Sequence, residues 1–145
     1  MGIDYGSARI GIAIGNTDDG IASPIEVIPA ENIPQAFERI ARIARDYQVE
    51  GLVVGWPLNM DNTEGPQGQS CRAFAIALAK STNLEVRLWD ERLSSFDADQ
   101  KLAGLLTRKK RKARQDALAA AAILRDFLAA GAGASNAPRP GDIKA

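Results

Sequence analysis

The chain has 145 residues, 46% of them hydrophobic, which is enough for one domain with a substantial core. Its formal net charge is zero, so the overall charge does not indicate a nucleic-acid partner, and its single cysteine excludes an internal disulfide. Because there is no histidine, Ser-His and Cys-His triads are excluded. With only one cysteine besides, the composition does not favour a zinc site, and any metal is expected to be Mg²⁺ or Mn²⁺ bound by oxygen.

The segment from Gly2 to Ile14 is predicted to form a β-hairpin. Gly6 and Gly11 stand where a positive φ or a close backbone approach would be needed. Asp4 interrupts the first strand, and a buried ionised carboxylate is costly unless it is paired or bound to a cation. It could be a turn aspartate at the hairpin corner. Glycines two residues to either side leave it little side-chain cover, which favours a functional site.

The rest of the chain alternates strands with helices. The predicted elements are a turn at 16–20, a strand at 21–28, a helix capped by Asn32, a strand at 49–55, a helix through 71–79, a strand at 84–89, a helix opened by Ser94 and Asp97 that ends near Leu106, and a last helix opened by Asp116. Short turns join antiparallel strands, and helical crossovers join parallel ones. We therefore predict an α/β fold with a mixed five-stranded sheet, three antiparallel then two parallel strands, flanked by helices.

The domain is expected to cover residues 1–130. Residues 131–145 are rich in Gly, Ala, Ser and Pro and are predicted to form a flexible tail. No apolar run approaches the ~20 residues that span a bilayer, and no secretory signal pattern opens the chain. We therefore expect a cytoplasmic protein without membrane contact.

Acidic residues at three points of the chain could meet at one end of this sheet: Asp4, the Asp90–Glu91 pair and Asp116. Converging carboxylates repel one another and need a cation. Two divalent ions held by them would stabilise the attacking and leaving oxygens of a phosphodiester displacement. Because neighbouring strand residues face opposite sides, only one of Asp90 and Glu91 should face the site, and we favour Glu91. Glu64 could be a fourth acid.

Each of these acids also has a purely structural interpretation. Asp116 could be an acid in the first turn of the last helix, where the helix dipole favours negative charge. The Asp90–Arg92 stretch could be a salt-bridged surface turn. Glu64 could be an ordinary solvated loop carboxylate. The residues alone leave these alternatives open.

Cations stand close to the candidate acids. A dense cluster precedes Asp116, made of Arg108, Lys109, Lys110, Arg111, Lys112 and Arg114. It could be a solvated linker between helices, or it could draw a phosphate backbone toward the acids. Arg9 and Arg92 could add phosphate contacts. Trp56 and Trp89 could stack on bases, but both belong to apolar strands, which favours burial.

Four segments resemble, in family order, the motifs of YqgF/RuvX-like proteins. They are GIDYG and RIGIA within 2–13, VGWPLNMD and TEGP within 54–66, DERLSS at 90–95 and DALAAA at 116–121. The resemblance extends from Gly2 to about Ala129, and the four together are specific. Asn62 stands where the family often has glycine. Only Met1 precedes Gly2, so that the first strand is short at its start.

The resemblance implies an RNase H-like fold, similar to Holliday junction resolvases, and a cytoplasmic bacterial endonuclease that matures the 5′ end of pre-16S ribosomal RNA in ribosome biogenesis. It assigns catalysis and binding of Mg²⁺ or Mn²⁺ to Asp4, Glu91 and Asp116. The substrate would be structured RNA or, for a junction resolvase, branched DNA. The protein would act as a monomer or a homodimer.

Two other hypotheses compete with a nuclease. A nucleotide-binding protein of the actin, Hsp70 and sugar-kinase class shares a similar first loop but needs two such domains, for which 145 residues are too few. A non-catalytic RNA-binding or assembly factor of the same fold is compatible with the sequence, because retained acids do not prove turnover.

Overall fold

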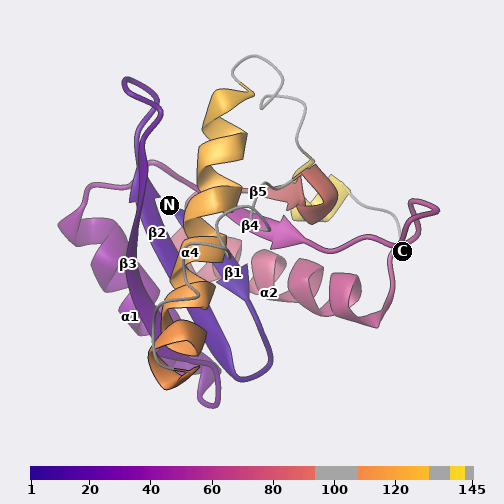
Figure 1. Cartoon of the computed structure of the whole chain (residues 1–145), viewed down its shortest axis with the longest axis horizontal. Helices are drawn as coiled ribbons and strands as arrows, with labels where there is room; N and C mark the ends of the chain where they lie inside the picture. The colour runs from indigo at the N-terminus through magenta and orange to yellow at the C-terminus, as the bar shows by residue number, and fades with distance from the viewer. Residues whose placement is uncertain (94–107, 131–137, 143–145) are drawn as a thin grey trace.

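The computed structural model describes residues 1–93, 108–130 and 138–142. Its larger elements, in chain order, are β1 (Gly2–Tyr5), β2 (Arg9–Gly15), β3 (Ala22–Pro29), α1 (Ile33–Asp46), β4 (Gly51–Trp56), α2 (Pro66–Thr82), β5 (Glu85–Asp90) and α4 (Arg108–Ala129) (Figure 1). Two short 3-10 helices are η1 (Glu91–Leu93) and η4 (Pro140–Asp142). The predicted helix at 94–106 lies outside the described residues.

The five strands form one mixed sheet in the order β3-β2-β1-β4-β5. The first three strands pair antiparallel, while β1, β4 and β5 run parallel. The prediction of three antiparallel and two parallel strands is therefore confirmed. The parallel strands end together near Tyr5, Trp56 and Asp90, because Trp56 pairs with Asp90 and Ile3 with Val54.

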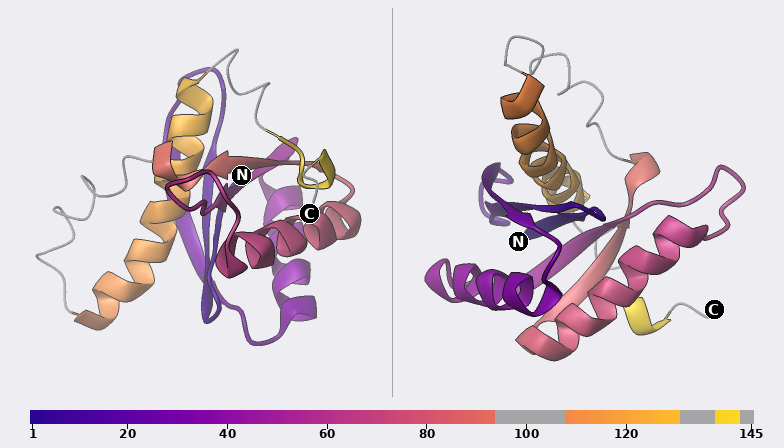
Figure 2. Two further views of the ribbon diagram at one scale, coloured as in Figure 1. Left: turned by 90° about the vertical axis from the view of Figure 1, so that its right-hand side faces the viewer. Right: turned by 90° about the horizontal axis from the view of Figure 1, so that it is seen from below.

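Helices cover both faces of the sheet. Figure 2 shows α4 on one face and both α1 and α2 on the other. The face toward α1 and α2 holds the larger core, which includes Ile3, Ile12, Leu52, Phe74 and Leu88. The face toward α4 holds a smaller core, which includes Ala13, Val53, Trp89, Ala120 and Leu124. Because side chains alternate along a strand, Asp4 lies on the same face as Gly2, and this is the α4 face.

Local sequence signals explain where several elements begin and end. The Asn32 side chain caps α1 by accepting a hydrogen bond from the Gln35 amide, and Pro34 lies in the first turn. At the C-terminal end of α2, Asn83 adopts a left-handed conformation and forms the C-cap. Asn62, where the family often has glycine, has a φ of 71° and so makes the turn that glycine would make.

The prediction that Asp116 opens the last helix is wrong. α4 begins at Arg108, so the basic segment belongs to the helix and no acidic residue lies in its first turn. The reason is intrinsic propensity, because arginine, lysine and alanine are good helix formers and no glycine or proline interrupts residues 108–116. Asp116 therefore lies inside the helix, where the dipole at the N-terminus does not reach it.

The described part of the C-terminal segment lies against β5 and α2. The Leu88 amide donates to the Pro138 carbonyl, and Arg139 forms an ion pair with Glu85. These contacts place residues 138–142 at the outer edge of β5, next to the final turn of α2.

Candidate active site

Asp4 and Glu91 are brought together at the C-terminal end of the parallel strands. Glu91 follows β5 directly, and alternation from Trp89 puts it on the α4 face with Asp4. Burial, followed by the negative charge of Asp116, raises the pKa of Asp4 to about 6. Burial, followed by the charges of Asp4 and Asp90, raises the pKa of Glu91 to about 7. Thus Asp4 interacts with both Glu91 and Asp116 across 87 and 112 positions of sequence.

Two glycines allow these acids to approach the sheet. Gly11 pairs with Asp4 in the β1–β2 ladder, and a Cβ at Gly11 would collide with the backbone carbonyl of Asp116. At Gly55 in β4, a Cβ would lie 2.6 Å from the Glu91 Oε1 atom. Neither glycine needs a positive φ, so their role is to leave space. The hairpin sequence predicts a close approach at Gly11, whereas no sequence signal indicates the role of Gly55.

Arg9 binds the third acid. Its Nε atom lies 2.6 Å from Asp116 Oδ2, and the two side chains are 42% and 25% exposed. The guanidinium therefore lies beside the acids at the start of β2, and part of it faces solvent. Arg9 was predicted to contact phosphate, and in the structure its described partner is Asp116.

Asp90 and Arg92 stabilise a turn next to Glu91. The Arg92 guanidinium lies 2.7 Å from Asp90 Oδ2, and this interaction holds the pKa of Asp90 below its usual value. Arg92 also donates to the Asn59 carbonyl and to the Asn62 side chain. The structure thus pairs Asp90 with Arg92, whereas Glu91 lies near enough to Asp4 for the charge of Asp4 to raise its pKa. That Glu91 is the catalytic member of the pair stays a prediction. Arg92 faces the loop after β4.

Glu64 is bound by neighbouring side chains that stabilise the fold, and it does not lie among the candidate acids. Its carboxylate accepts hydrogen bonds from the Arg72 guanidinium and from the Trp56 indole, at 3.0 and 2.8 Å. Hydrogen bonding from Arg72, with a further contribution from Trp56, lowers the pKa of Glu64. Trp56 therefore donates a hydrogen bond at the base of the loop. Sequence reasoning missed this use of Trp56 and the partner Arg72.

Cys71 lies buried beneath the acids, and its thiol is 3.9 Å from the Tyr5 carbonyl. Burial, together with the charges of Glu91, Asp4 and Glu64, raises the pKa of the Cys71 thiol to about 12. A thiol that stays protonated is a poor nucleophile and a poor metal ligand. Cys71 therefore contributes packing rather than chemistry.

The acids fit a hard divalent cation better than any other ligand class. Their donors are all carboxylate oxygens, and two of them carry raised pKa values that a cation would lower again. Gly55 leaves the space that Glu91 occupies beside the sheet. Within the described ranges, no three acidic, cysteine or histidine side chains are close enough to hold a metal ion as they stand. Asp116 instead binds Arg9.

The basic segment lies on the same helix as Asp116. Its backbone forms the first two turns of α4. The side chains of Arg108, Lys109, Lys110, Arg111, Lys112 and Arg114 are outside what the structure describes, so that their predicted contact with nucleic acid stays a prediction.

A separate hollow of about 660 Å³ opens at the other end of the sheet. Met1, Gly15, Gly51 and Phe127 are among the residues that line it, and none of the three candidate acids does. Ligands of α/β sheets bind at the carboxyl ends of parallel strands, which is where Asp4 and Glu91 lie. The acidic end is therefore the better candidate site.

The strand order, with acids at the carboxyl ends of the parallel strands, defines an RNase H-like α/β fold. The RuvX family model, described as a Holliday junction resolvase, matches residues 1–130. This chain belongs to that family. No described helix is long and apolar enough to cross a membrane.

Relatives and solved structures agree with this assignment. A protein of Bradyrhizobium diazoefficiens named "Putative pre-16S rRNA nuclease" is 42% identical over 129 residues, covering 88% of this chain and 80% of the relative. A protein of Bacillus cytotoxicus with the same name is 37% identical, covering 88% and 96%. The structure of T. thermophilus RuvC in complex with a Holliday junction substrate superposes with a TM-score of 0.58 and 16% identity, covering 95% of this chain and 96% of the other. At that identity it supports the fold alone.

Proposed function

We propose that this protein is a metal-dependent endonuclease that hydrolyses phosphodiester bonds of structured nucleic acid, with the 5′ end of pre-16S rRNA as its substrate. The observation that carries the proposal is that Asp4 is repelled by Asp116 and itself repels Glu91, at the carboxyl ends of the parallel strands. They come from distant parts of the chain, yet the charge of Asp4 raises the pKa of Glu91 and the charge of Asp116 raises that of Asp4. Such a cluster is electrostatically unfavourable without a cation.

In this mechanism Asp4 and Glu91 would hold Mg²⁺ or Mn²⁺ from the sheet side, and Asp116 would complete the set from α4. When bound, the cation supplies Lewis-acid stabilisation of the phosphoryl oxygens and activates water as the nucleophile. Arg9 lies beside Asp116 with part of its guanidinium exposed, so that it can bind a phosphate oxygen next to the acids. The basic residues in the first turns of α4 would attract the phosphate backbone of the nucleic acid electrostatically.

The substrate class is taken from the relatives named for pre-16S rRNA, and the family description adds branched DNA as an alternative. Ribosomal RNA as substrate implies a cytoplasmic protein. The protein would act as a monomer or as a homodimer.

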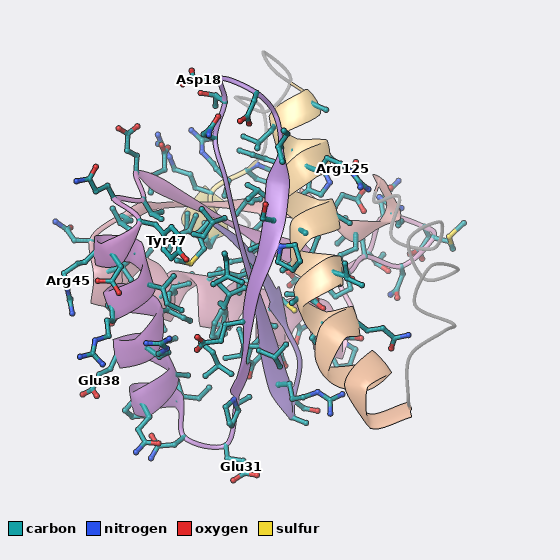
Figure 3. All side chains as sticks on the ribbon, turned by 60° about the vertical axis from the view of Figure 1, so that its left-hand side comes forward. Asp18, Glu31, Glu38, Arg45, Tyr47 and Arg125 are labelled. Atoms are coloured by element: carbon teal, nitrogen blue, oxygen red, sulfur yellow. The ribbon has the colours of Figure 1, made fainter. Side chains whose placement is uncertain are left out.

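The proposal is tested by cleavage of a folded RNA that contains the 5′ end of 16S rRNA with its leader, and of a four-way DNA junction. Each is incubated with Mg²⁺, Mn²⁺ or EDTA. The test variant is Asp4→Asn, and the matched control is Asp18→Asn. Asp18 lies in the exposed turn between β2 and β3 (Figure 3).

We expect cleavage with either metal and none in EDTA. Asp4→Asn should reduce cleavage by at least about a hundredfold, as for other losses at metal sites, while binding persists and Asp18→Asn has no effect. Cleavage of RNA but not of the junction would support the rRNA substrate, and the reverse would support a junction resolvase. Binding without cleavage under every metal would refute the nuclease and support an assembly factor.

A further inference from the structure

The loop between β4 and α2, residues 57–65, is stabilised by a dense set of hydrogen bonds. The Asn59 amide donates to the Thr63 carbonyl, and the Asn62 amide donates to the Asn59 carbonyl. The Asn59 side chain donates to the Thr63 hydroxyl. The Asp61 carboxylate accepts from both the amide and the hydroxyl of Thr63. A short loop with this many internal bonds presents its tip in one conformation.

The same loop is connected to the acidic end of the sheet. Arg92, the residue after Glu91, donates to the Asn59 carbonyl at 3.0 Å and to Asn62 Oδ1 at 2.9 Å. The guanidinium is in turn held by Asp90. At the base of the loop, Glu64 is held by Arg72. The loop tip is therefore fixed relative to Glu91.

Met60 stands at this tip and is 91% exposed, more than the other large hydrophobic side chains on the surface of the described residues. Ile21, in the turn before β3, is 62% exposed, and Tyr47 is 51% exposed. Full burial of a methionine side chain would contribute about 1.5–3 kcal/mol, and the fold does not use it here. The neighbouring residues, Asn59, Asp61 and Asn62, are polar and exposed.

We propose that Met60 is a wedge that inserts between unstacked bases at a branch point or at the end of a duplex, next to the acids. This inference rests on the proposed nuclease function and specifies which part of a structured nucleic acid the site selects. Apolar side chains, methionine among them, are used in this way by proteins that open base steps.

The charges around the tip favour bases over the phosphate backbone. Hydrogen bonding from Thr63 lowers the pKa of Asp61, so that this carboxylate stays ionised beside Met60 and repels phosphates. The nearby cation, Arg92, is directed to Asp90 and to the loop. A protein partner would need several hundred Å² of contact area, whereas Met60 is surrounded by polar residues. A single apolar side chain on a rigid tip matches a gap between two bases.

The inference is tested without cleavage, in EDTA, by binding to a four-way DNA junction and to an RNA stem–loop. Each carries 2-aminopurine at the branch or at the end of the stem, and a linear duplex carries it at an internal position. The fluorescence of 2-aminopurine rises when the base unstacks. The variants are Met60→Ala, Met60→Gln and Met60→Leu, and the control is Ile21→Ala, which removes a distant exposed apolar side chain.

We expect the wild-type protein and Met60→Leu to raise the fluorescence at the branch or stem end. Met60→Ala and Met60→Gln should not, and they should bind that probe about tenfold more weakly, as loss of one buried apolar side chain implies. Affinity for the linear duplex should not change. Unchanged fluorescence and affinity in Met60→Ala, or an equal loss in Ile21→Ala, would overturn the inference.

The inference and the proposed function can fail separately. If the wild type opens the branch in a Met60-dependent way but never cleaves with Mg²⁺ or Mn²⁺, the wedge stands and the nuclease proposal fails. If the wild type cleaves and Met60→Ala behaves identically, the wedge is refuted and the nuclease stands.

Discussion

Gly11 lies directly against the backbone carbonyl of Asp116, so closely that a single Cβ atom at Gly11 would overlap it. Gly11 is also the cross-strand partner of Asp4. The same missing side chain therefore lets α4 approach the sheet and brings Asp116 next to Asp4. Gly2, in β1, makes a similarly close contact with Ala120 and Leu124, which lie further along α4.

This contact predicts that Gly11→Ala destabilises the fold. The obstacle is helix backbone, which cannot rotate away, so the helix must shift, and we expect a loss of about 1–3 kcal/mol in the free energy of unfolding. Gly141→Ala is the matched control, because a Cβ there meets no atom within 4 Å. Chemical denaturation measures both variants. Equal stability of Gly11→Ala and the wild type would contradict the packing of α4.

The raised pKa values of Asp4 and Glu91 predict a pH-dependent stability in EDTA. A carboxyl group whose pKa is higher in the folded state binds its proton more tightly there than in the unfolded chain. The free energy of unfolding should therefore fall as pH rises from about 4, the ordinary pKa of a carboxyl group, to about 8, which lies above the pKa values of about 6 and about 7 for Asp4 and Glu91. Above that range the loss is complete.

Asp4→Asn removes one of these charges. At pH 8 it should be more stable than the wild type by about 3 kcal/mol, which corresponds to the rise in the pKa of Asp4 from 3.8 to about 6. The difference should vanish near pH 4. Thermal or urea unfolding across this range measures it, with Asp18→Asn as the control. A variant less stable than the wild type at pH 8 would show that the Asp4 carboxylate is well paired without metal.

Glu64 and Glu91 should respond in opposite directions to the same substitution. Glu64→Gln weakens the contacts with Arg72 and Trp56, so that we expect a lower melting temperature at pH 8 and unchanged Mn²⁺ affinity. Glu91→Gln relieves repulsion from Asp4, so that we expect a higher melting temperature in EDTA and weaker Mn²⁺ binding. Loss of Mn²⁺ binding in Glu64→Gln would instead make Glu64 the fourth acid.

Arg9 is expected to compete with metal and to assist substrate binding. Removing its charge in Arg9→Gln should strengthen Mn²⁺ binding about fivefold, because roughly 1 kcal/mol of repulsion between exposed charges is lost. Nucleic-acid binding should weaken, and Arg9→Lys should restore most of it. Calorimetry with Mn²⁺ and fluorescence anisotropy with nucleic acid measure the two effects. If Arg9→Gln weakened Mn²⁺ binding and nucleic-acid binding alike, the role of Arg9 would be only to stabilise the fold.

The strand order and the meeting of Asp4 with Glu91 could be predicted from the sequence, because they follow from turn lengths and side-chain alternation. The start of α4 could not, because Asp116 resembles a helix-opening residue and the charged stretch before it resembles a linker. Likewise, nothing in the loop sequence distinguishes a catalytic Glu64 from one paired with Arg72. Gly55 was missed because its role depends on Glu91, which is 36 positions away and follows a different strand, β5.

The basic start of α4 is predicted to contribute sequence-independent binding. Arg111→Glu combined with Lys112→Glu should weaken affinity for all nucleic-acid probes and reduce the slope of log affinity against log salt by about 2. The measurement is a salt titration of anisotropy. Unchanged affinity and slope would remove this segment from the binding surface.

The most direct test of a shared cation site is anomalous diffraction from crystals of the protein grown with Mn²⁺. We predict an anomalous peak within coordination distance of carboxylate oxygens of both Asp4 and Glu91, with Asp116 released from Arg9 toward it. Ordered crystals in saturating Mn²⁺ with no peak between Asp4 and Glu91 would contradict the account.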